Sequence, residues 1–329
     1  MGKTLIFIKL SSLNECIKYS TIISKIAREL SIHKGNELYI WVSCSEMCQK
    51  RTKHLFRELQ NALCELYLSS ATTNDSSLLS VVPTIVLFEY WSNIQLGSIT
   101  DSWNSVYYSE NAKDQILNIP AKSFQSIGPD VLNEIHNIEH LPKKDESEDS
   151  GKEINNMVSA VGGTFDHLHV GHKVLLTLTA WFGVKEVIVG VSGTKNENGR
   201  TLIILGDELL KKKVQKEFLE NIQKRKEEVS NFLHSIKEDI NCRVVTIHDP
   251  FGPTITDAEI DSLIVSEETK TGATAVQEER VKRGLPELSI YCIDLLYPAQ
   301  ELNLKDNNSL KVSSTAIREE LAKLAYKNK

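Results

Sequence analysis

Two histidines, three positions apart, lie in the segment of this chain with the most evident chemistry. The segment runs from Gly162 to His172, reads GGTFDHLHVGH, and contains the pair as His169 and His172. The apolar run Met157–Val161 precedes it and a helical periodicity follows it, so the segment predicts a turn from a strand into a helix. Free backbone N–H groups and the positive end of a helix dipole favour bound anions at such a junction.

The side chains of this segment suit a phosphate ligand. If the first helical turn includes His169 and His172, both imidazoles lie on one face and converge on one phosphate. Gly171 leaves room for a nucleotide base or ribose close to the backbone, and the Thr164 hydroxyl can donate to a phosphate oxygen. A zinc site is disfavoured because no glutamate stands beside the first histidine, as the zincin pattern requires. A plain polar turn is the alternative that these residues leave open.

Six landmarks together resemble the nucleotidylyltransferase superfamily, and most closely its eukaryotic type of phosphopantetheine adenylyltransferase. The histidine segment is similar to the T/HxGH motif of that superfamily, and the resemblance covers about half of the chain, from Val158 to Arg318. The five further landmarks, in chain order, are the lysine-rich stretch Asp207–Leu233, DPFGPT at Asp249–Thr254, VSEET at Val265–Thr269, RVKRGL at Arg280–Leu285 and VSSTAIR at Val312–Arg318. The common order of the landmarks supports the assignment to the superfamily. The middle landmarks support the assignment of phosphopantetheine as the acceptor.

The resemblance implies a reaction as well as a fold. The fold would be a Rossmann-like domain, and the reaction would transfer the adenylyl group of ATP to 4'-phosphopantetheine, giving dephospho-CoA and pyrophosphate. The acceptor phosphate arrives already ionised, so no general base or covalent intermediate is needed, and Mg²⁺ would accompany the ATP. Catalysis then reduces to aligning two phosphates and stabilising the charge that develops between them.

The resemblance also implies roles for individual residues. Thr164 is expected to position the acceptor phosphate, His172 to stabilise the α-phosphoryl oxygens, and His169 to hold the β and γ phosphates. Either Lys211 or Lys213 is expected to hold phosphates of ATP and the acceptor, and the sequence leaves that choice open. No metal site held by the protein itself is expected. The full set of expected ATP-binding residues is Gly163, Phe165, His169, Gly171, His172, Arg280, Ser313, Ser314, Thr315 and Arg318.

Two of these groups also have simpler explanations. Ser313, Ser314 and Thr315 precede a helical pattern, where one hydroxyl is commonly an N-cap, but three hydroxyls exceed that need and predict a second anion site. Arg280 lies near the end of a predicted helix, where a favourable interaction with the helix dipole explains it equally well. The segment Gly193–Leu205 has no counterpart in the family pattern and predicts an inserted surface loop more than a lid.

The alternation of strand-like and helical patterns predicts two α/β domains. Residues 157–329 predict a five-stranded parallel sheet, with the histidine segment at the carboxyl end of its first strand. Residues 1–139 predict a smaller α/β domain of unknown role, and the charged residues 140–156 predict a linker. The predicted strands are Thr4–Ile8, Leu38–Val42, Val81–Phe88, Met157–Val161, Lys185–Val191, Arg243–Ile247, Ser262–Ser266 and Ser289–Leu295. The predicted helices include Asn14–Leu30, Ser45–Leu68 and Asp207–Ile236, and the last of these is either one long helix or two.

Composition limits the class of protein. The 329 residues are 41% hydrophobic and 25% charged, as in soluble globular proteins, and no apolar run approaches the length that spans a membrane. A formal net charge of -6 argues against a general nucleic-acid binder. Six cysteines without a metal-ligand pattern predict reduced thiols. Without a recognisable secretion signal, we expect a cytoplasmic protein.

The sequence leaves two other functions open. The first keeps the superfamily and changes the substrates, to cytidylyl transfer or to adenylyl transfer onto nicotinamide mononucleotide. The second is a scaffold protein of CoA synthesis, with protein partners bound through the N-terminal domain. No GxxxxGKS or GxxxxGKT loop follows the adenylyltransferase region, so a fused dephospho-CoA kinase is not expected and the enzyme is expected to be monofunctional.

Overall fold

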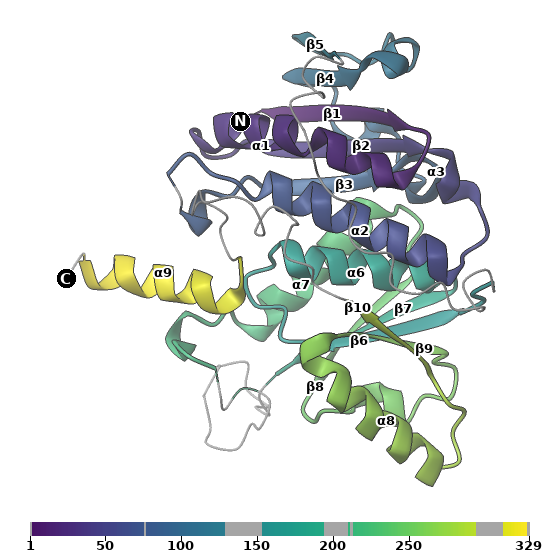
Figure 1. Ribbon diagram of the computed structural model, residues 1–329. Coiled ribbons are helices and arrows are strands. Elements are labelled where there is room, and N and C mark those ends of the chain that lie inside the picture. The colour runs from purple at the N-terminus through teal and green to yellow at the C-terminus, as the bar shows by residue number, and fades with distance from the viewer. Residues whose placement is uncertain are drawn as a thin grey trace. The chain divides into compact units, whose positions relative to one another are not determined.

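The protein forms two compact units, each with its own sheet (Figure 1). The computed structural model describes residues 2–75, 77–128, 153–193, 210, 213–293 and 312–327. Among these residues, unit 1 comprises 2–75, 77–128, 153–154 and 236–238, and unit 2 comprises 155–193, 210, 213–235, 239–293 and 312–327. Most of the predicted linker 140–156 lies outside the described residues, so the predicted domain boundaries stay a prediction.

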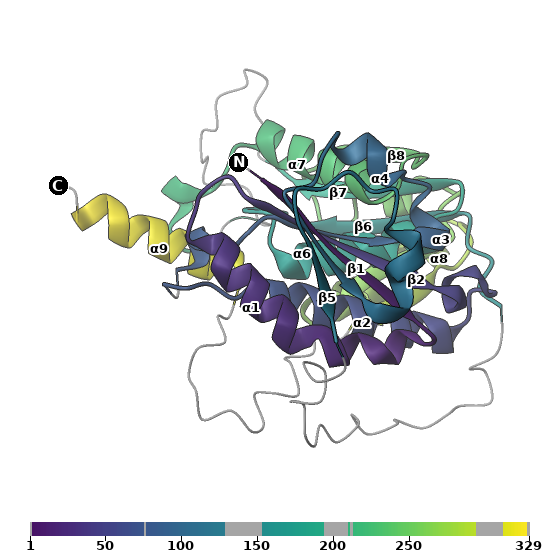
Figure 2. The same ribbon diagram turned by 90° about the horizontal axis from the view of Figure 1, so that it is seen from above.

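Unit 1 is built on a parallel sheet with the strand order β3-β2-β1-β4-β5. Its two long helices, α1 and α2, lie on the same face of this sheet, as Figures 1 and 2 both show. Leu5, Ile6 and Ile8 of the central strand are fully buried, because both faces of that strand are covered. The elements are β1 (Lys3–Leu10), a 3-10 helix (Leu13–Tyr19), α1 (Ser20–Ser31), β2 (Glu37–Cys44), a 3-10 helix (Ser45–Cys48), α2 (Lys53–Ser70), a 3-10 helix (Leu78–Ser80), β3 (Thr84–Phe88), α3 (Glu89–Ser92), α4 (Leu96–Ile99), β4 (Ser105–Ser109), a 3-10 helix (Glu110–Gln115) and β5 (Phe124–Ile127).

Unit 2 is built on a second parallel sheet with the order β10-β9-β6-β7-β8. If the strands of each unit are counted from its own first strand, both sheets have the order 3-2-1-4-5. The predicted fold, two α/β domains with a five-stranded parallel sheet in the second, is therefore confirmed. The elements are β6 (Val158–Gly163), α6 (Val170–Phe182), β7 (Glu186–Ser192), a 3-10 helix (Lys216–Phe218), α7 (Ile222–Ile236), β8 (Cys242–Ile247), a 3-10 helix (Gly252–Ile255), β9 (Ser262–Ser266), a 3-10 helix (Glu267–Thr269), α8 (Lys270–Lys282), β10 (Ser289–Ile293) and α9 (Ser314–Lys327).

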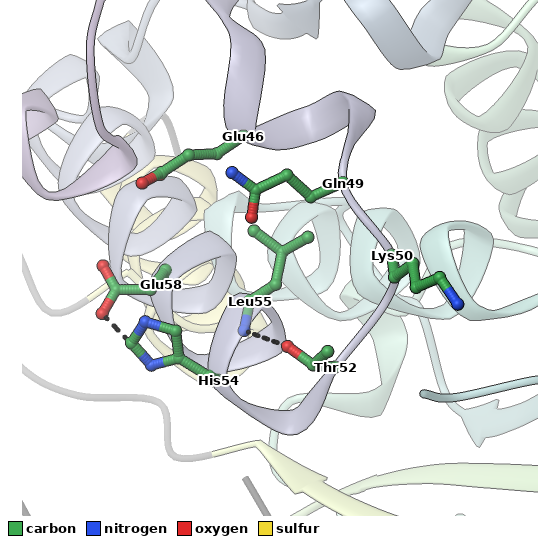
Figure 3. A pocket seen from close by; sticks show the side chains of 7 residues that line it. All are labelled: Glu46, Gln49, Lys50, Thr52, His54, Leu55 and Glu58. Carbon is green, nitrogen blue, oxygen red and sulfur yellow. Dashed lines mark hydrogen bonds and ion pairs between the residues drawn. The ribbon is translucent and has the colours of Figure 1, made fainter. Parts of the chain in front are cut away.

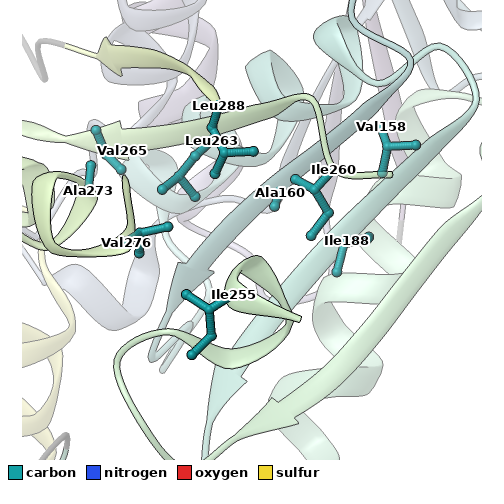
Figure 4. Close-up of a cluster of buried hydrophobic side chains, with 10 residues drawn as sticks. All are labelled: Val158, Ala160, Ile188, Ile255, Ile260, Leu263, Val265, Ala273, Val276 and Leu288. Carbon is teal, nitrogen blue, oxygen red and sulfur yellow. The ribbon is translucent and has the colours of Figure 1, made fainter. Parts of the chain in front are cut away.

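A cluster of buried aliphatic side chains packs α8 against the sheet of unit 2 (Figure 4). Val158 and Ala160 belong to the cluster because alternate residues of a strand point to the same face. Complete burial of one aliphatic side chain contributes roughly 1.5–3 kcal/mol. The cluster therefore stabilises the position of β6 in the sheet, and β6 is the strand that leads into the histidine segment. Its members are Val158, Ala160, Ile188, Ile255, Ile260, Leu263, Val265, Ala273, Val276 and Leu288.

Each of the eight predicted strands corresponds to a strand of the structure. The third begins at Thr84 rather than Val81, because Pro83 has no N–H to contribute to the sheet. β4 and β5 were not predicted from the sequence. Their segments, SVYYS and FQSI, are short and carry few aliphatic residues, so their hydrophobic signal is weak.

All three helices named from the sequence begin later as α-helices than their patterns indicate. α1 begins at Ser20, because the residues before it, Leu13–Tyr19, form a 3-10 helix. The pattern that starts at Ser45 is interrupted, and α2 begins at Lys53, where the Thr52 hydroxyl accepts a hydrogen bond from the N–H of the third helical residue. The lysine-rich pattern is interrupted as well, and α7 begins at Ile222. Gln215, with a φ of 52°, is in the left-handed region, which an α-helix does not accommodate.

Candidate functional site

The histidine segment lies at the topological switch point of unit 2. It follows β6, and the chain continues to β7 on one side of this strand and later to β9 on the other. In open parallel sheets, ligands bind outside the carboxyl ends of the strands at this point. The 13 residues of α6 begin immediately after His169. A helix N-terminus with its unpaired N–H groups therefore faces the same end of the sheet.

His169 is the N-cap of α6 and uses one of its ring nitrogens for this purpose. Its Nδ1 accepts a hydrogen bond of 3.2 Å from the backbone N–H of Gly171. The proton of neutral His169 must therefore be on Nε2. The cap orients the imidazole at the first turn of the helix, and it leaves the Nε2 proton for a ligand.

The rings of His169 and His172 stack, with 3.9 Å between their centroids. The ring of Phe165 is 5.3 Å from that of His172 and is itself completely buried. Nδ1 of His172 is buried and has no hydrogen-bond partner among the described residues. Buried polar atoms almost always have a partner, so this nitrogen indicates a place for a ligand or a water molecule.

Both histidines are neutral at pH 7. Burial lowers the pKa of His169 to about 4, and the nearby charge of Lys173 contributes to this shift. Burial also holds the pKa of His172 well below its usual range, with smaller contributions from His169 and Lys213. A buried imidazolium loses its hydration, which favours the neutral ring. The histidines can donate hydrogen bonds to phosphate oxygens, but the lysines must supply the positive charge.

Two lysines contribute this charge. Lys213 is close enough to His172 for its charge to lower the pKa of that ring. Burial lowers the pKa of Lys173 to about 8, so most of its amine is still protonated at pH 7. Lys211, the other predicted phosphate-binding lysine, lies outside the described residues, as do residues 194–205 of the predicted insertion.

The turn before α6 contains the other predicted residues of the segment. Thr164 is half-buried, and its Oγ1 accepts a long hydrogen bond of 3.4 Å from Ser192 Oγ. A Cβ on Gly163 would lie only 3.0 Å from the ring of Phe165, so the buried ring packs directly against this glycine. The aromatic ring of Phe165 thus belongs to the core, and any contact with a nucleotide would be made by its backbone.

The start of α9 lies against this turn. Ser314 Oγ donates to the backbone oxygen of Asp166 at 2.8 Å, although the two residues are 148 positions apart. Ser313 Oγ accepts from the N–H of Ala316 as an N-cap, and Thr315 Oγ1 accepts from Arg318. A hydroxyl that accepts a bond keeps its proton for donation, so Ser313 and Thr315 can still donate to a phosphate. The fold therefore brings the serine–threonine segment and the histidine segment together.

The two predicted arginines are buried and bonded to the protein. Arg280 has no exposed surface, and its guanidinium donates to the carbonyl oxygens of Thr254, Asp257, Ile260 and Pro286. It holds the backbone around the DPFGPT segment, whose last residues form a 3-10 helix. Arg318 is 1% exposed and forms an ion pair with Asp166. The predicted contacts of both arginines with ATP stay predictions, and these protein contacts were not foreseen.

The sequence patterns did not predict a role for three residues around the site. Asp166 is completely buried, Arg225 is 2% exposed, and Glu220 bonds to the turn between β6 and α6. The signal for Asp166 was its place inside the histidine segment. Arg225 and Glu220 stand in a lysine-rich and glutamate-rich stretch, where nothing distinguishes them from residues of a solvated helix.

The equivalent position in unit 1, after β1, is occupied by carboxylates. The backbone N–H groups of Ser11 and Ser12 both donate to Glu15 Oε1 at 3.1 Å. The N–H of Leu13 donates to Glu46 Oε2 at 2.8 Å. The N–H groups that would bind a phosphate at this switch point are thus satisfied within the protein, so unit 1 does not repeat the anion site of unit 2.

A cavity of about 340 Å³ in unit 1 also has unsuitable chemistry for phosphate (Figure 3). Two carboxylates, Glu46 and Glu58, are part of its lining, together with His54 and Lys50. Adjacent carboxylates repel an anion. In the part of the chain that the structure describes, no cluster of His, Cys, Asp and Glu could hold a metal ion. None of the described helices is long and apolar enough to cross a membrane.

Comparisons with known proteins identify the family of the chain. No family model matches the chain. Along the whole length of both proteins, the chain is 96% identical to an uncharacterized protein of Schizosaccharomyces pombe. It is 32% identical to the phosphopantetheine adenylyltransferase of Saccharomyces cerevisiae, over 66% of this chain and 68% of that protein. It is 31% identical to the phosphopantetheine adenylyltransferase of Methanopyrus kandleri, over 49% of this chain and 88% of that protein. The chain belongs to the phosphopantetheine adenylyltransferase family of nucleotidyltransferases.

Proposed function

We propose that this protein transfers the adenylyl group of ATP to the phosphate of 4'-phosphopantetheine and so forms dephospho-CoA and pyrophosphate. One structural observation supports this reaction in addition to the family membership. The start of α9 is hydrogen-bonded to the turn of the histidine segment, through Ser314 Oγ and the backbone oxygen of Asp166. Two segments with phosphate-binding chemistry therefore share one end of the sheet, as a reaction between two phosphates requires.

In the proposed reaction, an oxygen of the acceptor phosphate attacks the α-phosphorus of ATP. The bond between this phosphorus and the bridging oxygen breaks, and pyrophosphate leaves with the bonding electrons. Thr164 and Lys213 position the acceptor phosphate, and His172 donates to the α-phosphoryl oxygens. The β and γ phosphates are held by His169 with Ser313 and Thr315. Arg280 and Arg318 receive no phosphate contact in this assignment, because their guanidiniums bond to protein oxygens.

The low pKa values of the two histidines suit this chemistry. The acceptor phosphate is already ionised, so His169 and His172 do not need to remove a proton. As neutral rings they keep one N–H each to donate to a phosphate oxygen, and their charge does not change with pH near neutrality. The positive charge of Lys213 would offset the charge that develops on the phosphates.

Magnesium enters the proposal as part of the nucleotide. Within the histidine segment, the carboxylate of Asp166 pairs with Arg318. Mg²⁺ is commonly bound by phosphate oxygens and water with few protein ligands. It would therefore arrive with ATP and offset the charge of the phosphates. A cytoplasmic location, and protein partners for unit 1, also belong to the proposal.

The purified full-length protein should release pyrophosphate from ATP and Mg²⁺ only when 4'-phosphopantetheine is present. Dephospho-CoA should accumulate, and CoA should not, because the chain contains no GxxxxGKS or GxxxxGKT loop. Parallel reactions with CTP in place of ATP, and with nicotinamide mononucleotide as acceptor, test the other nucleotidyl transfers. Faster pyrophosphate release in either of these reactions would overturn the assignment of the substrates. Absence of release in all of them would favour a scaffold protein.

A further inference from the structure

The turn between β6 and α6 holds a backbone conformation that its residues do not prefer. Phe165 has a φ of 48° and His167 a φ of 46°, both in the left-handed region. For residues other than glycine, this region is energetically unfavourable. The contacts around the turn must therefore stabilise it. Asp166 is the residue between these two.

Contacts from the segment around the start of α7 hold the backbone of the turn. Arg225 Nη1 donates to the carbonyl oxygen of Thr164 at 2.7 Å. The N–H of His167 donates to Glu220 Oε2 at 2.7 Å, and the His167 ring bonds to the carbonyl oxygen of Phe218 at 2.8 Å. The turn is thus held on both sides of Asp166 by residues that are far away in the sequence.

Asp166 connects this turn to α9. Its carboxylate accepts the N–H of Glu220 through Oδ1, at 2.9 Å, and pairs with Arg318 through Oδ2. Its backbone oxygen accepts the hydroxyl of Ser314. Asp166 and Arg318 are 0% and 1% exposed, so this ion pair is excluded from water. The N-terminal part of α9 therefore has two links, through Ser314 and Arg318, to a single residue of the histidine segment.

All three nitrogens of the Arg318 guanidinium donate to protein oxygens. Nη1 pairs with Asp166, Nε donates to the carbonyl oxygen of Val214 at 2.9 Å, and Nη2 donates to Thr315 Oγ1 at 3.1 Å. A phosphate ligand of Arg318 would have to compete with these oxygens at a site that is 1% exposed. The contact with Thr315 also orients a hydroxyl that we assign to the phosphates of ATP.

We propose that the Asp166–Arg318 pair is a positioning element that sets the distance between the two phosphate-binding segments of the active site. On one side, Asp166 lies between Thr164 and the two histidines; on the other, Arg318 holds Thr315. In this role Arg318 acts through other residues and does not bind a phosphate itself. The proposal rests on the proposed function, because it concerns how the acceptor and ATP are aligned.

The expected effect follows from the alignment of the two phosphates. Each segment can still bind its own phosphate when the pair is broken, but the attacking oxygen and the α-phosphorus lose their alignment. A misplacement of about 1 Å can reduce the rate of reaction on the order of 100-fold. Removal of one partner leaves the other charge buried without compensation, whereas removal of both charges together is tolerated much better.

A double-mutant cycle tests the proposal in the full-length protein. The variants are Asp166→Asn, which keeps the shape of the side chain, Arg318→Met, which keeps much of its length, and the combination of both. For each, we would measure kcat, the KM of both substrates, and the dissociation constant of ATP with Mg²⁺ by calorimetry. Each single variant should lower kcat on the order of 100-fold and leave the ATP dissociation constant within about threefold. The combined variant should lose no more activity than either single variant.

The opposite pattern would overturn the proposal. If Arg318 binds a phosphate of ATP, Arg318→Met should weaken ATP binding about 10- to 100-fold, also in the Asp166→Asn background, and the losses should multiply. If a single variant does not fold, the combined variant, which has no unpaired buried charge, provides the same comparison with the wild type. Absence of turnover in the wild-type protein would count against the proposed function, and the ATP dissociation constants would still decide the role of Arg318.

Discussion

The stacked rings of His169 and His172, with 3.9 Å between their centroids and 26° between their planes, form a neutral pair at the N-terminus of α6. Two protonated rings would repel each other at this distance. Burial and proximity therefore act in the same direction and keep both rings uncharged at pH 7. A site of this kind offers N–H donors in a preorganised arrangement, and it takes its charge from Lys213 and Lys173.

Removal of the His172 ring should reduce catalysis without preventing folding. We expect His172→Ala to lower kcat on the order of 100- to 1000-fold, because one preorganised donor to the α-phosphoryl oxygens is lost. The KM for ATP should change little if this donor acts mainly in the transition state. The matched control is His234→Ala, which removes an exposed histidine of α7 that bonds to a backbone oxygen. Near-normal turnover of His172→Ala would exclude the assigned role.

Stability should decrease at mildly acidic pH because both histidines are neutral in the folded state. The pKa of His169 is about 4 when folded and about 6.5 when unfolded, so the unfolded chain binds more protons between these values. The contribution of neutral His169 to the free energy of unfolding is complete above pH 6.5 and is lost as the pH falls toward 4. The pKa of His172 is shifted in the same direction.

A variant without a titrating ring at position 172 tests this dependence. Between pH 7 and pH 5, the thermal unfolding midpoint of His172→Gln should fall less than that of the wild-type protein, because one of the two shifted groups is absent. His234→Gln, which replaces an exposed histidine of α7, is measured in parallel as the matched control. Equal pH dependence in all three proteins would mean that His172 is not held neutral.

Lys213 should affect both the acceptor and His172. A hydrogen bond to a charged group is worth about 1.5–3 kcal/mol, so Lys213→Ala should raise the KM for the phosphopantetheine acceptor roughly 10- to 100-fold. Burial is the main cause of the low pKa of His172, and the charge of Lys213 lowers it further, so the pKa, followed by NMR titration, should rise in part when Lys213 is removed. Lys216→Ala removes a lysine three positions further along the chain, and it should change neither the KM for the acceptor nor the pKa of His172. If the pKa of His172 shifts and the KM for the acceptor does not change, Lys213 lies near His172 but does not bind the acceptor.

Arg280 should stabilise the protein and have no direct role in binding ATP. Arg280→Met leaves four carbonyl oxygens without their donor, and an unsatisfied buried polar group costs about 1–3 kcal/mol. The thermal unfolding midpoint should therefore fall clearly, while the folded protein keeps the wild-type KM for ATP. Arg283→Met is the control, because its ion pair with Glu279 lies at the surface, where solvent screens the charges and the pair adds little stability. A raised KM for ATP without loss of stability would instead support the phosphate contact that the sequence suggests.

Local sequence patterns were sufficient to predict most strands of the two sheets. They also predicted the position of the histidine segment after a strand. The strands of unit 2 were predictable because their apolar runs are short and separated by turn residues and helical patterns. β4 and β5 were not, because strands of SVYYS and FQSI depend on their neighbours in the sheet and not on their own hydrophobicity. The interpretation of Asp207–Ile236 as one continuous helix was wrong for a similar reason, since composition does not show the left-handed residue Gln215 that interrupts it.

The sequence by itself determined the strand-to-helix turn and the set of side chains able to meet a phosphate, since strand, turn and helix preferences act over a few neighbouring residues. Only the tertiary structure decided which charged groups face one another. Asp166 and Arg318 are 152 positions apart, and Arg280 takes its partners from the backbone of other elements. A buried charge must find partners wherever the packed chain provides them, so its role depends on contacts that no local pattern encodes.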